Sequence, residues 1–193
     1  MSQDPQQLVL AGTGNIYVAP AGTTLPADTD PTAELDPAFI ELGLTTTDGA
    51  TFTRTPEIQE FGSWQRRRTT RREVVSETLV AAFSLQQWNS DNFSLAFGGG
   101  TFAETDPGVF KYTPPSAAES LPEYAFVLDW RDGDKNYRVV IERGNHTEAV
   151  ETTLARSDLS VLPISFSALG GEDEDDPGWF FITDDPAFET TGS

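Results

Sequence analysis

Short runs of β-branched and aromatic residues recur along most of this chain, and glycine, proline, asparagine or aspartate residues separate them. Runs of this kind between turn formers are typical of strands that pair with their neighbours in sequence. The pattern predicts strands at residues 15–19, 39–42, 74–85, 109–112, 124–131, 136–143, 148–154 and 160–168. The fold class that follows is mainly β, with most strands antiparallel.

One segment, residues 89–97, departs from the strand pattern and predicts a short helix. Asn89 can accept a hydrogen bond from a free backbone N–H of the first turn, and Trp88 and Phe93 have the spacing of a hydrophobic staple. Gly98 can end the helix. Because the face that carries Phe93 is apolar, we expect this helix to pack against a sheet.

Turn and loop residues predict how the strands connect. Asp and Gly at 132–135 favour a tight hairpin, and Gly144 with the asparagine after it favours a second turn. Together these turns predict a three-stranded meander over residues 124–154. Residues 21–38 and 56–72 are predicted as loops, and the length of the second is typical of a functional loop.

The length of 193 residues suits one domain with a single core. We expect residues 1–170 to form that domain and residues 171–193 to form an acidic and aromatic extension of it. The acidic run GEDEDDPG, which opens the extension, has the pattern of a solvated segment. Large apolar residues follow at 179–182, and we expect them to pack on the domain or on a neighbouring copy.

The chain contains no cysteine, which excludes disulfides and thiolate chemistry. The sequence shows no apolar run of about 18 residues and no pattern of a secretory signal, so neither a membrane span nor secretion is expected. We therefore expect the chain to be made in the cytoplasm. Its stability must come from packing and from contacts between subunits.

Charge is strongly negative and unevenly distributed. The net charge is −19, and all twelve basic residues lie between residues 54 and 156. Binding to nucleic acid needs lysine and arginine to replace the counterions of phosphate groups. A chain this acidic is expected to repel DNA.

Catalytic and metal-binding patterns are incomplete. His146 is the only histidine, and no serine lies in a nucleophile motif, so a catalytic triad has little to build on. Asp132 and Asp134 imitate the start of a calcium loop, but Tyr137 stands where that loop needs glycine and Arg143 where it needs glutamate. The sequence predicts a hairpin turn there, no enzyme activity, and no catalytic, metal or cofactor site.

An arginine cluster in the predicted 56–72 loop is the clearest candidate for an interaction site. Glutamates flank the cluster, and Phe61 and Trp64 precede it. Arginine forms forked hydrogen bonds to carboxylates, and aromatic residues often anchor interfaces. The cluster predicts contact with an acidic surface of a neighbouring copy; a solvated loop and a nucleic-acid site are the alternatives, and the aromatic rings could instead cover the domain's own core. The candidate interface residues are Phe61, Trp64, Arg66, Arg67, Arg68, Arg71 and Arg72.

Four segments occur in a characteristic order: GTGNIYVAPAGTTLP, ELGLTTTDG, the stretch 62–100 that joins the arginines to the predicted helix, and LPISFSAL. In this order they resemble the major tail (tail-tube) protein of long non-contractile tailed bacteriophages, especially those that infect actinobacteria. The resemblance implies an antiparallel β-sandwich or barrel-like fold with one flanking helix. It also implies a structural virion protein that is assembled in the host bacterial cytoplasm and located in the virion tail.

The resemblance further implies an assembly and its partners. Copies would form hexameric rings stacked into a hollow tube, in contact with a tape measure protein and a tail terminator, and phage DNA would pass through the lumen without specific binding. The alternative is a monomeric β-sandwich module on a virion surface that binds a glycan or a protein. That alternative predicts a concave aromatic site and no ordered polymer.

Overall fold

Antiparallel strands make up most of the computed structural model, which describes residues 7–116, 120–146, 148–171 and 176–189. The main sheet has the strand order β2-β1-β7-β8-β9-β4-β3, with β10 paired to β8, and β5 and β6 form a separate hairpin. This confirms the mainly β fold class with one short helix. The elements are β1 (Thr13–Pro20), β2 (Ile40–Glu41), β3 (Thr45–Ser63), β4 (Arg66–Leu85), α1 (Ser90–Ala96), β5 (Thr101–Asp106), β6 (Val109–Thr113), β7 (Tyr124–Asp132), β8 (Lys135–His146), β9 (Leu162–Ala168), β10 (Trp179–Thr183) and the short 3₁₀ helix η2 (Pro186–Phe188).

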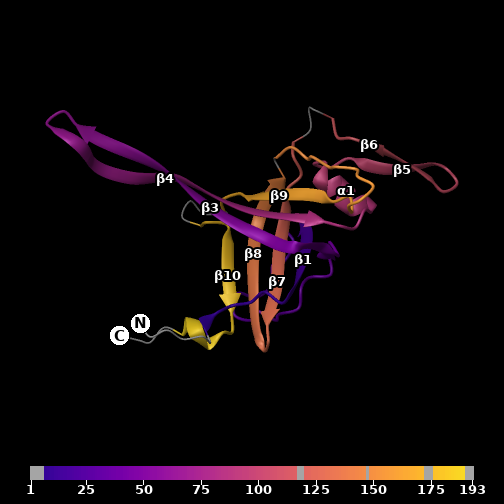
Figure 1. Cartoon of the computed structure of the whole chain (residues 1–193), viewed down its shortest axis with the longest axis horizontal. Helices are drawn as coiled ribbons and strands as arrows, with labels where there is room; N and C mark the ends of the chain where they lie inside the picture. The colour runs from indigo at the N-terminus through magenta and orange to yellow at the C-terminus, as the bar shows by residue number, and fades with distance from the viewer. Residues whose placement is uncertain (1–6, 117–119, 147, 172–175, 190–193) are drawn as a thin grey trace.

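The main sheet folds across itself because β8 has two neighbours on one of its sides. Its middle, Tyr137–Ile141, pairs with β10, whereas its end, Gly144–His146, pairs with β9. β9 then pairs with β4, so that β9, β4 and β3 cross steeply over the layer of β1, β7 and β8 (Figure 1). Two sheet layers that cross in this way enclose an orthogonally packed core.

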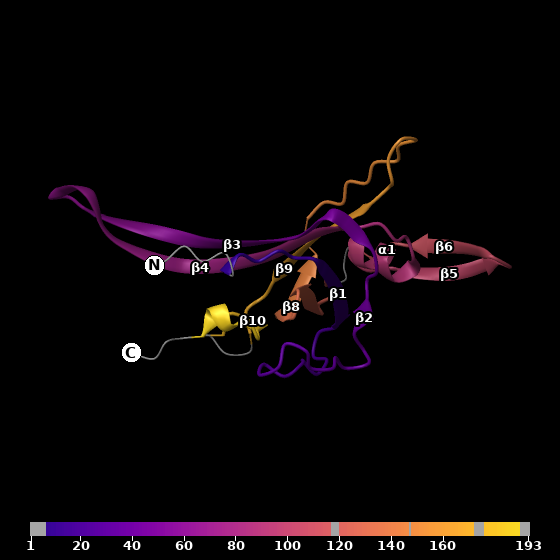
Figure 2. The same cartoon turned by 60° about the horizontal axis from the view of Figure 1, so that its bottom comes forward.

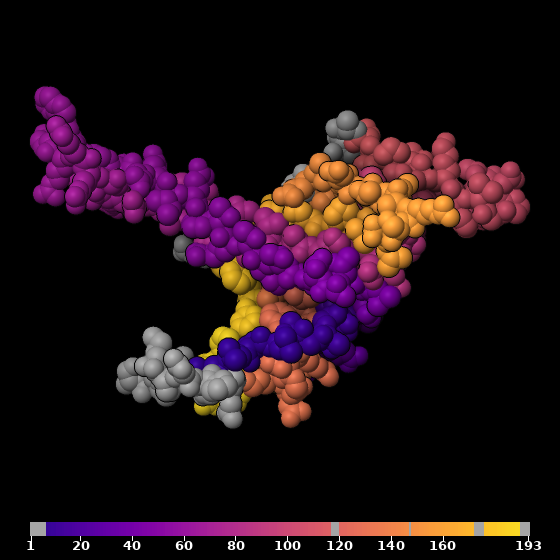
Figure 3. All heavy atoms as spheres, in the orientation of Figure 1, coloured from indigo at the N-terminus to yellow at the C-terminus, as the bar shows by residue number. Residues whose placement is uncertain are grey.

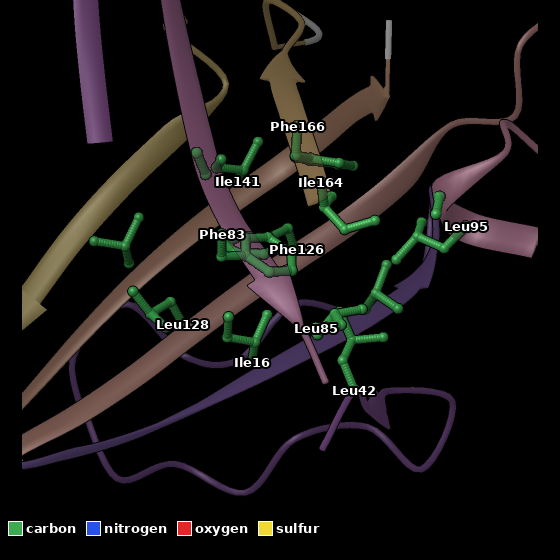
Figure 4. Packing of buried hydrophobic residues seen from close by; sticks show 14 of the residues in the cluster. Ile16, Leu42, Phe83, Leu85, Leu95, Phe126, Leu128, Ile141, Ile164 and Phe166 are labelled. Atoms are coloured by element: carbon green, nitrogen blue, oxygen red, sulfur yellow. The ribbon is translucent and has the colours of Figure 1, made fainter. Parts of the chain in front are cut away.

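The core lies where the two layers cross. Alternate residues of each strand point into it, as a period of two requires. The Phe126 ring of β7 is stacked between the Phe83 ring of β4, with centroids 5.7 Å apart, and the Phe166 ring of β9, 5.4 Å away. Ile16 of β1 and Leu42, which follows β2, are also buried at this crossing (Figure 4).

The helix forms where the capping pattern predicts it. The Asn89 side-chain oxygen accepts a hydrogen bond from the backbone N–H of Asn92 at 2.7 Å. The Trp88 and Phe93 ring centroids are 6.0 Å apart, as a staple requires, and Gly98 just after the helix has a φ of 72°, which favours glycine. The helix packs against the core cluster through its buried residues, so the prediction of one packed helix is confirmed.

Two of the predicted connections differ from the structure. The hairpin at 132–135 is confirmed, but the turn at Gly144 is wrong, because β8 continues through it. A Cβ atom on Gly144 would collide with the backbone oxygen of Ser167 in β9. Glycine at this position therefore allows close strand pairing and does not turn the chain.

The predicted strand 148–154 is also wrong. These residues form no strand, and the third strand of the meander is β9, which starts at Leu162. Val150 packs against the core but Leu154 is exposed, so this segment has no continuous buried side-chain face that would hold it in the sheet. The surface loop predicted at 21–38 is confirmed, since that range contains no helix or strand.

The C-terminal aromatic run packs on the domain, as predicted. It forms β10 beside β8, with Trp179 and Phe181 against the core. The acidic residues 172–175 lie outside the described part of the chain.

A buried hydrogen bond fastens the chain after β10. Tyr137 donates its hydroxyl proton to Asp185 at 2.6 Å, and Lys135 Nζ lies 2.9 Å from the other carboxylate oxygen. The hydrogen bond from Tyr137 is the main reason that the pKa of Asp185 is lowered to about 2, whereas burial is the main reason that the pKa of Tyr137 is raised to about 12.

Truncation of two phenylalanines should destabilise the protein by different amounts, because one lies in the core and the other at its margin. Phe126 is 1% exposed at the layer crossing, so Phe126→Ala should lower the free energy of unfolding by about 3 to 5 kcal/mol. Phe93 is only partly buried, so Phe93→Ala should cost less than about 3 kcal/mol. Urea unfolding followed by circular dichroism measures both values. Equal losses would contradict the placement of α1 at the margin of the core.

The Asp185 contact should make stability depend on acid pH. A carboxylate whose pKa is lowered from 3.8 to about 2 stabilises the fold above its unfolded pKa and loses that contribution as the pH falls towards 2. Asp185→Asn should therefore have a lower thermal midpoint than wild type at pH 7, and the difference should shrink between about pH 4 and pH 2. Asp48→Asn, at an exposed position, controls for loss of a charge. A difference that does not change with pH would contradict this role.

Candidate subunit interface

The β3–β4 hairpin extends far beyond the body of the protein (Figures 1 and 3). β4 pairs with β9 only from Val80 to Leu85. Residues 54–78, called the arm below, pair only along the β3–β4 ladder within the described part of the chain. The prediction of a loop at 56–72 is therefore wrong, since these residues form two paired strands joined by a tight turn.

The arm is held together by contacts across its own two strands. Arg54 pairs with Glu77, and Arg72 Nε donates to Glu60 Oε1 at 2.7 Å. A hydrogen bond from Thr69, and then the one from Arg72, keeps the pKa of Glu60 below its ordinary value. Such exposed pairs contribute little each, and a two-stranded ribbon is only marginally stable alone. The arm therefore gains most of its stability when another surface covers it.

The arginine cluster divides into two groups in the structure. Arg71 pairs with Glu73, and Arg72 with Glu60, within the arm. Among the described residues, no carboxylate forms an ion pair with Arg66, Arg67 or Arg68, which lie at the tip and are exposed. Three positive charges thus face solvent at the end of the arm.

The aromatic residues near the cluster also differ from one another. Trp64, in the turn of the arm, is 99% exposed, and Phe61 is 40% exposed. Phe52, near the base of β3, packs against the hydrophobic core. Only Phe52 therefore covers the domain's own core, whereas the indole of Trp64 is free to enter a partner.

A second projection, the β5–β6 hairpin, leaves the body at the end opposite the arm (Figures 1 and 2). Between this hairpin and α1 lies an apolar groove of about 520 Å³. We call it the aromatic groove; it is lined by Trp88, Asn89, Ser90, Phe93, Phe102, Phe110 and Tyr112. This groove was not predicted from the sequence, although the spacing of Phe110 and Tyr112, with Phe102 shortly before them, was a usable signal.

His146 has a structural environment. It lies at the end of β8, and its Nδ1 is 3.1 Å from the backbone nitrogen of Ser165 and 2.7 Å from the oxygen of the same residue. Its ring is buried in the sheet, and no serine hydroxyl or carboxylate is hydrogen-bonded to it in the described part of the chain. This arrangement does not form a catalytic triad.

The sequence motif at 132–136 forms a hairpin turn. Asp132 accepts a hydrogen bond from the backbone of Leu10, and Asn136 donates its backbone and side-chain N–H groups to Asp184. Across the ranges that the structure describes, no three acidic or histidine side chains gather as a metal site. Within the same ranges, no helix has both the length and the apolar character needed to cross a membrane.

Comparison with known proteins agrees with this architecture. A family model described as "Phage tail tube protein" matches residues 1–192. The major tail protein Gp23 of Mycobacterium phage D29 is 27% identical over 193 residues, which cover 90% of each chain. The mainly antiparallel β fold with one short helix and an exposed arm is consistent with these matches, which extend over nearly the whole length. The chain therefore belongs to the phage tail tube protein family, whose members are structural proteins of the virion.

Proposed function

We propose that this protein assembles into hexameric rings that stack into the tail tube of a long non-contractile phage. The observation that carries the proposal is the arm, whose exposed Trp64 and three tip arginines, which form no ion pair with any described residue, need a partner surface. The family match supports the structural role in the virion. The tape measure protein and the tail terminator are the partners proposed for the lumen and the end of the tube, and assembly would take place in the host cytoplasm.

Unpaired strand edges support assembly through sheet extension. In the described part of the chain, β3 pairs only with β4, β10 only with β8, and the two-residue β2 only with β1. Open edges present free backbone N–H and C=O groups that pair readily with another chain. Edge pairing between copies would join their sheets around a ring, and the whole chain, residues 171–193 included, would act as one domain.

The charge distribution supports a conduit that does not hold DNA. The arm contains six of the twelve basic residues and only four of the 31 acidic ones, so the rest of the chain has six bases and 27 acids. Three of the remaining bases, Lys135, Arg138 and Arg143, already pair with carboxylates. If the arm is covered by other subunits, the surface left to line the bore is strongly negative and repels phosphate.

Electron microscopy of the purified protein over a range of concentrations tests the proposal. Wild-type protein should form tubes of constant diameter built from rings, and averaged end views should show sixfold symmetry. A protein that stays monomeric at every concentration, and that binds a glycan in the aromatic groove, would instead support the monomeric module.

Removal of the tip arginines should suppress assembly without unfolding the subunit. Arg66, Arg67 and Arg68 are exposed, so their joint replacement by Ser should change the free energy of unfolding by no more than about 0.5 kcal/mol. Sedimentation should nevertheless show far less polymer. The matched control replaces Lys111, Arg131 and Arg156 by Ser, because it removes the same charge from exposed positions outside the arm. If both triple variants polymerise like wild type, the tip arginines do not dock.

Assembled tubes should bind DNA very weakly. Anisotropy of a labelled duplex at 50 and 200 mM salt should give a dissociation constant above about 10⁻⁴ M, weaker than ordinary non-specific binding. An arginine introduced at a position that lines the bore should slow genome ejection without preventing tail assembly. Tight binding that falls steeply with salt would contradict a repelling bore.

A further inference from the structure

The two projections of the subunit have complementary chemistry, and this complementarity suggests what the arm binds. We propose that the aromatic groove of one copy receives Trp64 from the arm of a second copy, and that the tip arginines of that arm contact acidic residues at the rim of the groove. The inference rests on the proposed self-assembly and names the two surfaces that meet.

The donor side is a single large side chain at the end of a ribbon. Trp64 is 99% exposed in the turn that joins β3 to β4. An aromatic side chain of this size removes roughly 150 to 250 Å² from water when it is enclosed. Nothing in the described part of its own chain covers it, so its burial must come from another molecule.

The receiving side is concave, apolar and partly exposed. Phe93 of α1 contacts Tyr112 of β6 edge-on, with ring centroids 4.9 Å apart, and these two rings belong to the lining of the groove. Phe110 also lines the groove and is 66% exposed. The volume of about 520 Å³ is within the range of cavities that enclose ligands, and an indole ring fits such a space.

Acidic residues border the aromatic groove. Glu104 is directly opposite Phe110 in the β5–β6 register, so its side chain is on the same face of the hairpin as the aromatic lining. Asp91 is exposed in the first turn of α1, next to the groove residue Ser90. Neither carboxylate forms an ion pair within the described residues. The rim therefore offers negative charge to the unpaired arginines at Arg66–Arg68.

The positions of the two projections exclude pairing within one molecule. The arm and the β5–β6 hairpin leave the body in opposite directions, as two views show (Figures 1 and 2). A copy that docks its arm therefore leaves its own groove open for the next copy. Such a head-to-tail contact propagates from molecule to molecule, as a stacked assembly requires.

Single substitutions on each side should weaken the contact equally. Trp64→Ala and Phe110→Ser change exposed residues, so both variants should keep the wild-type thermal midpoint. Each should raise the dissociation constant for self-association at least about 30-fold, the effect expected of an interface hot spot. Val109→Ser is the matched control, because Val109 is exposed on the opposite face of β6. Association unchanged by Trp64→Ala or Phe110→Ser would overturn the proposal.

A mixing experiment tests whether the two surfaces meet each other. The Trp64→Ala variant keeps an intact groove, and the Phe110→Ser variant keeps an intact arm, so one joint can form between them but no chain can grow. Mass photometry should show dimers in the equimolar mixture and few in either variant alone. A mixture as monomeric as its components would overturn the pairing.

Two further variants test the role of the rim charge and the position of Trp64 in the contact. Glu104→Gln keeps an acceptor for the hydrogen bond that Gly108 now donates to Glu104, but removes the negative charge. It should weaken association about two- to fivefold at low salt and hardly at all at high salt. A photo-crosslinking residue at position 64 should label residues 88–112 of another copy; labelling only of strand edges or of the exposed Leu8–Leu10 segment would overturn the proposal.

Tube formation by the wild-type and Trp64→Ala proteins distinguishes a failure of this inference from a failure of the proposed function. If Trp64→Ala protein still forms tubes as wild type does, the docking is wrong and the tube role stands. If wild-type protein forms no tube, the proposed function itself fails.

Discussion

The stacking of Phe83, Phe126 and Phe166 is the contact on which the remaining architecture depends. It joins the two sheet layers and fixes the inner half of β4, and the outer half of the same strand forms one side of the arm. Because a single strand runs from core to tip, the orientation of the arm is set by buried packing. The arm itself is held by exposed ion pairs, which contribute little to stability. The body is thus stabilised by buried packing, whereas the arm is stabilised by exposed contacts across its own two strands.

Sequence reasoning succeeded where local chemistry decides the structure. The cap at Asn89, the turn before Lys135, the apolar run of β7 and the alternation of apolar residues in β9 each depend on a few neighbouring residues. Prediction from the sequence failed where a contact between distant residues determines the structure. Gly144 was interpreted as a turn because only the facing strand β9 shows why glycine is needed there. Residues 148–154 contain β-branched residues typical of a strand, but no strand in the described part of the chain pairs with them.

The candidate site shows the same division. The arginine cluster at residues 66–72 was evident from the sequence, and Trp64 was a candidate anchor that could instead have covered the core, yet residues 56–72 of the arm were predicted as a loop. The apolar residues of the arm do not recur at every second position, so the arm lacks the period-two hydrophobicity by which strands are recognised. The aromatic groove was missed because its walls come from α1 and from a hairpin that follows it, and only the folded chain brings Phe93 beside Tyr112.

The thinness of the arm has a mechanical consequence. A two-stranded ribbon twists and bends far more readily than a packed two-layer body, because only one ladder of backbone hydrogen bonds resists the deformation. In a filament whose successive subunits are joined by such ribbons, curvature concentrates in the joints and each body keeps its shape. A long tail could then sway as a phage diffuses, while the cross-section of its channel stays constant along the curve.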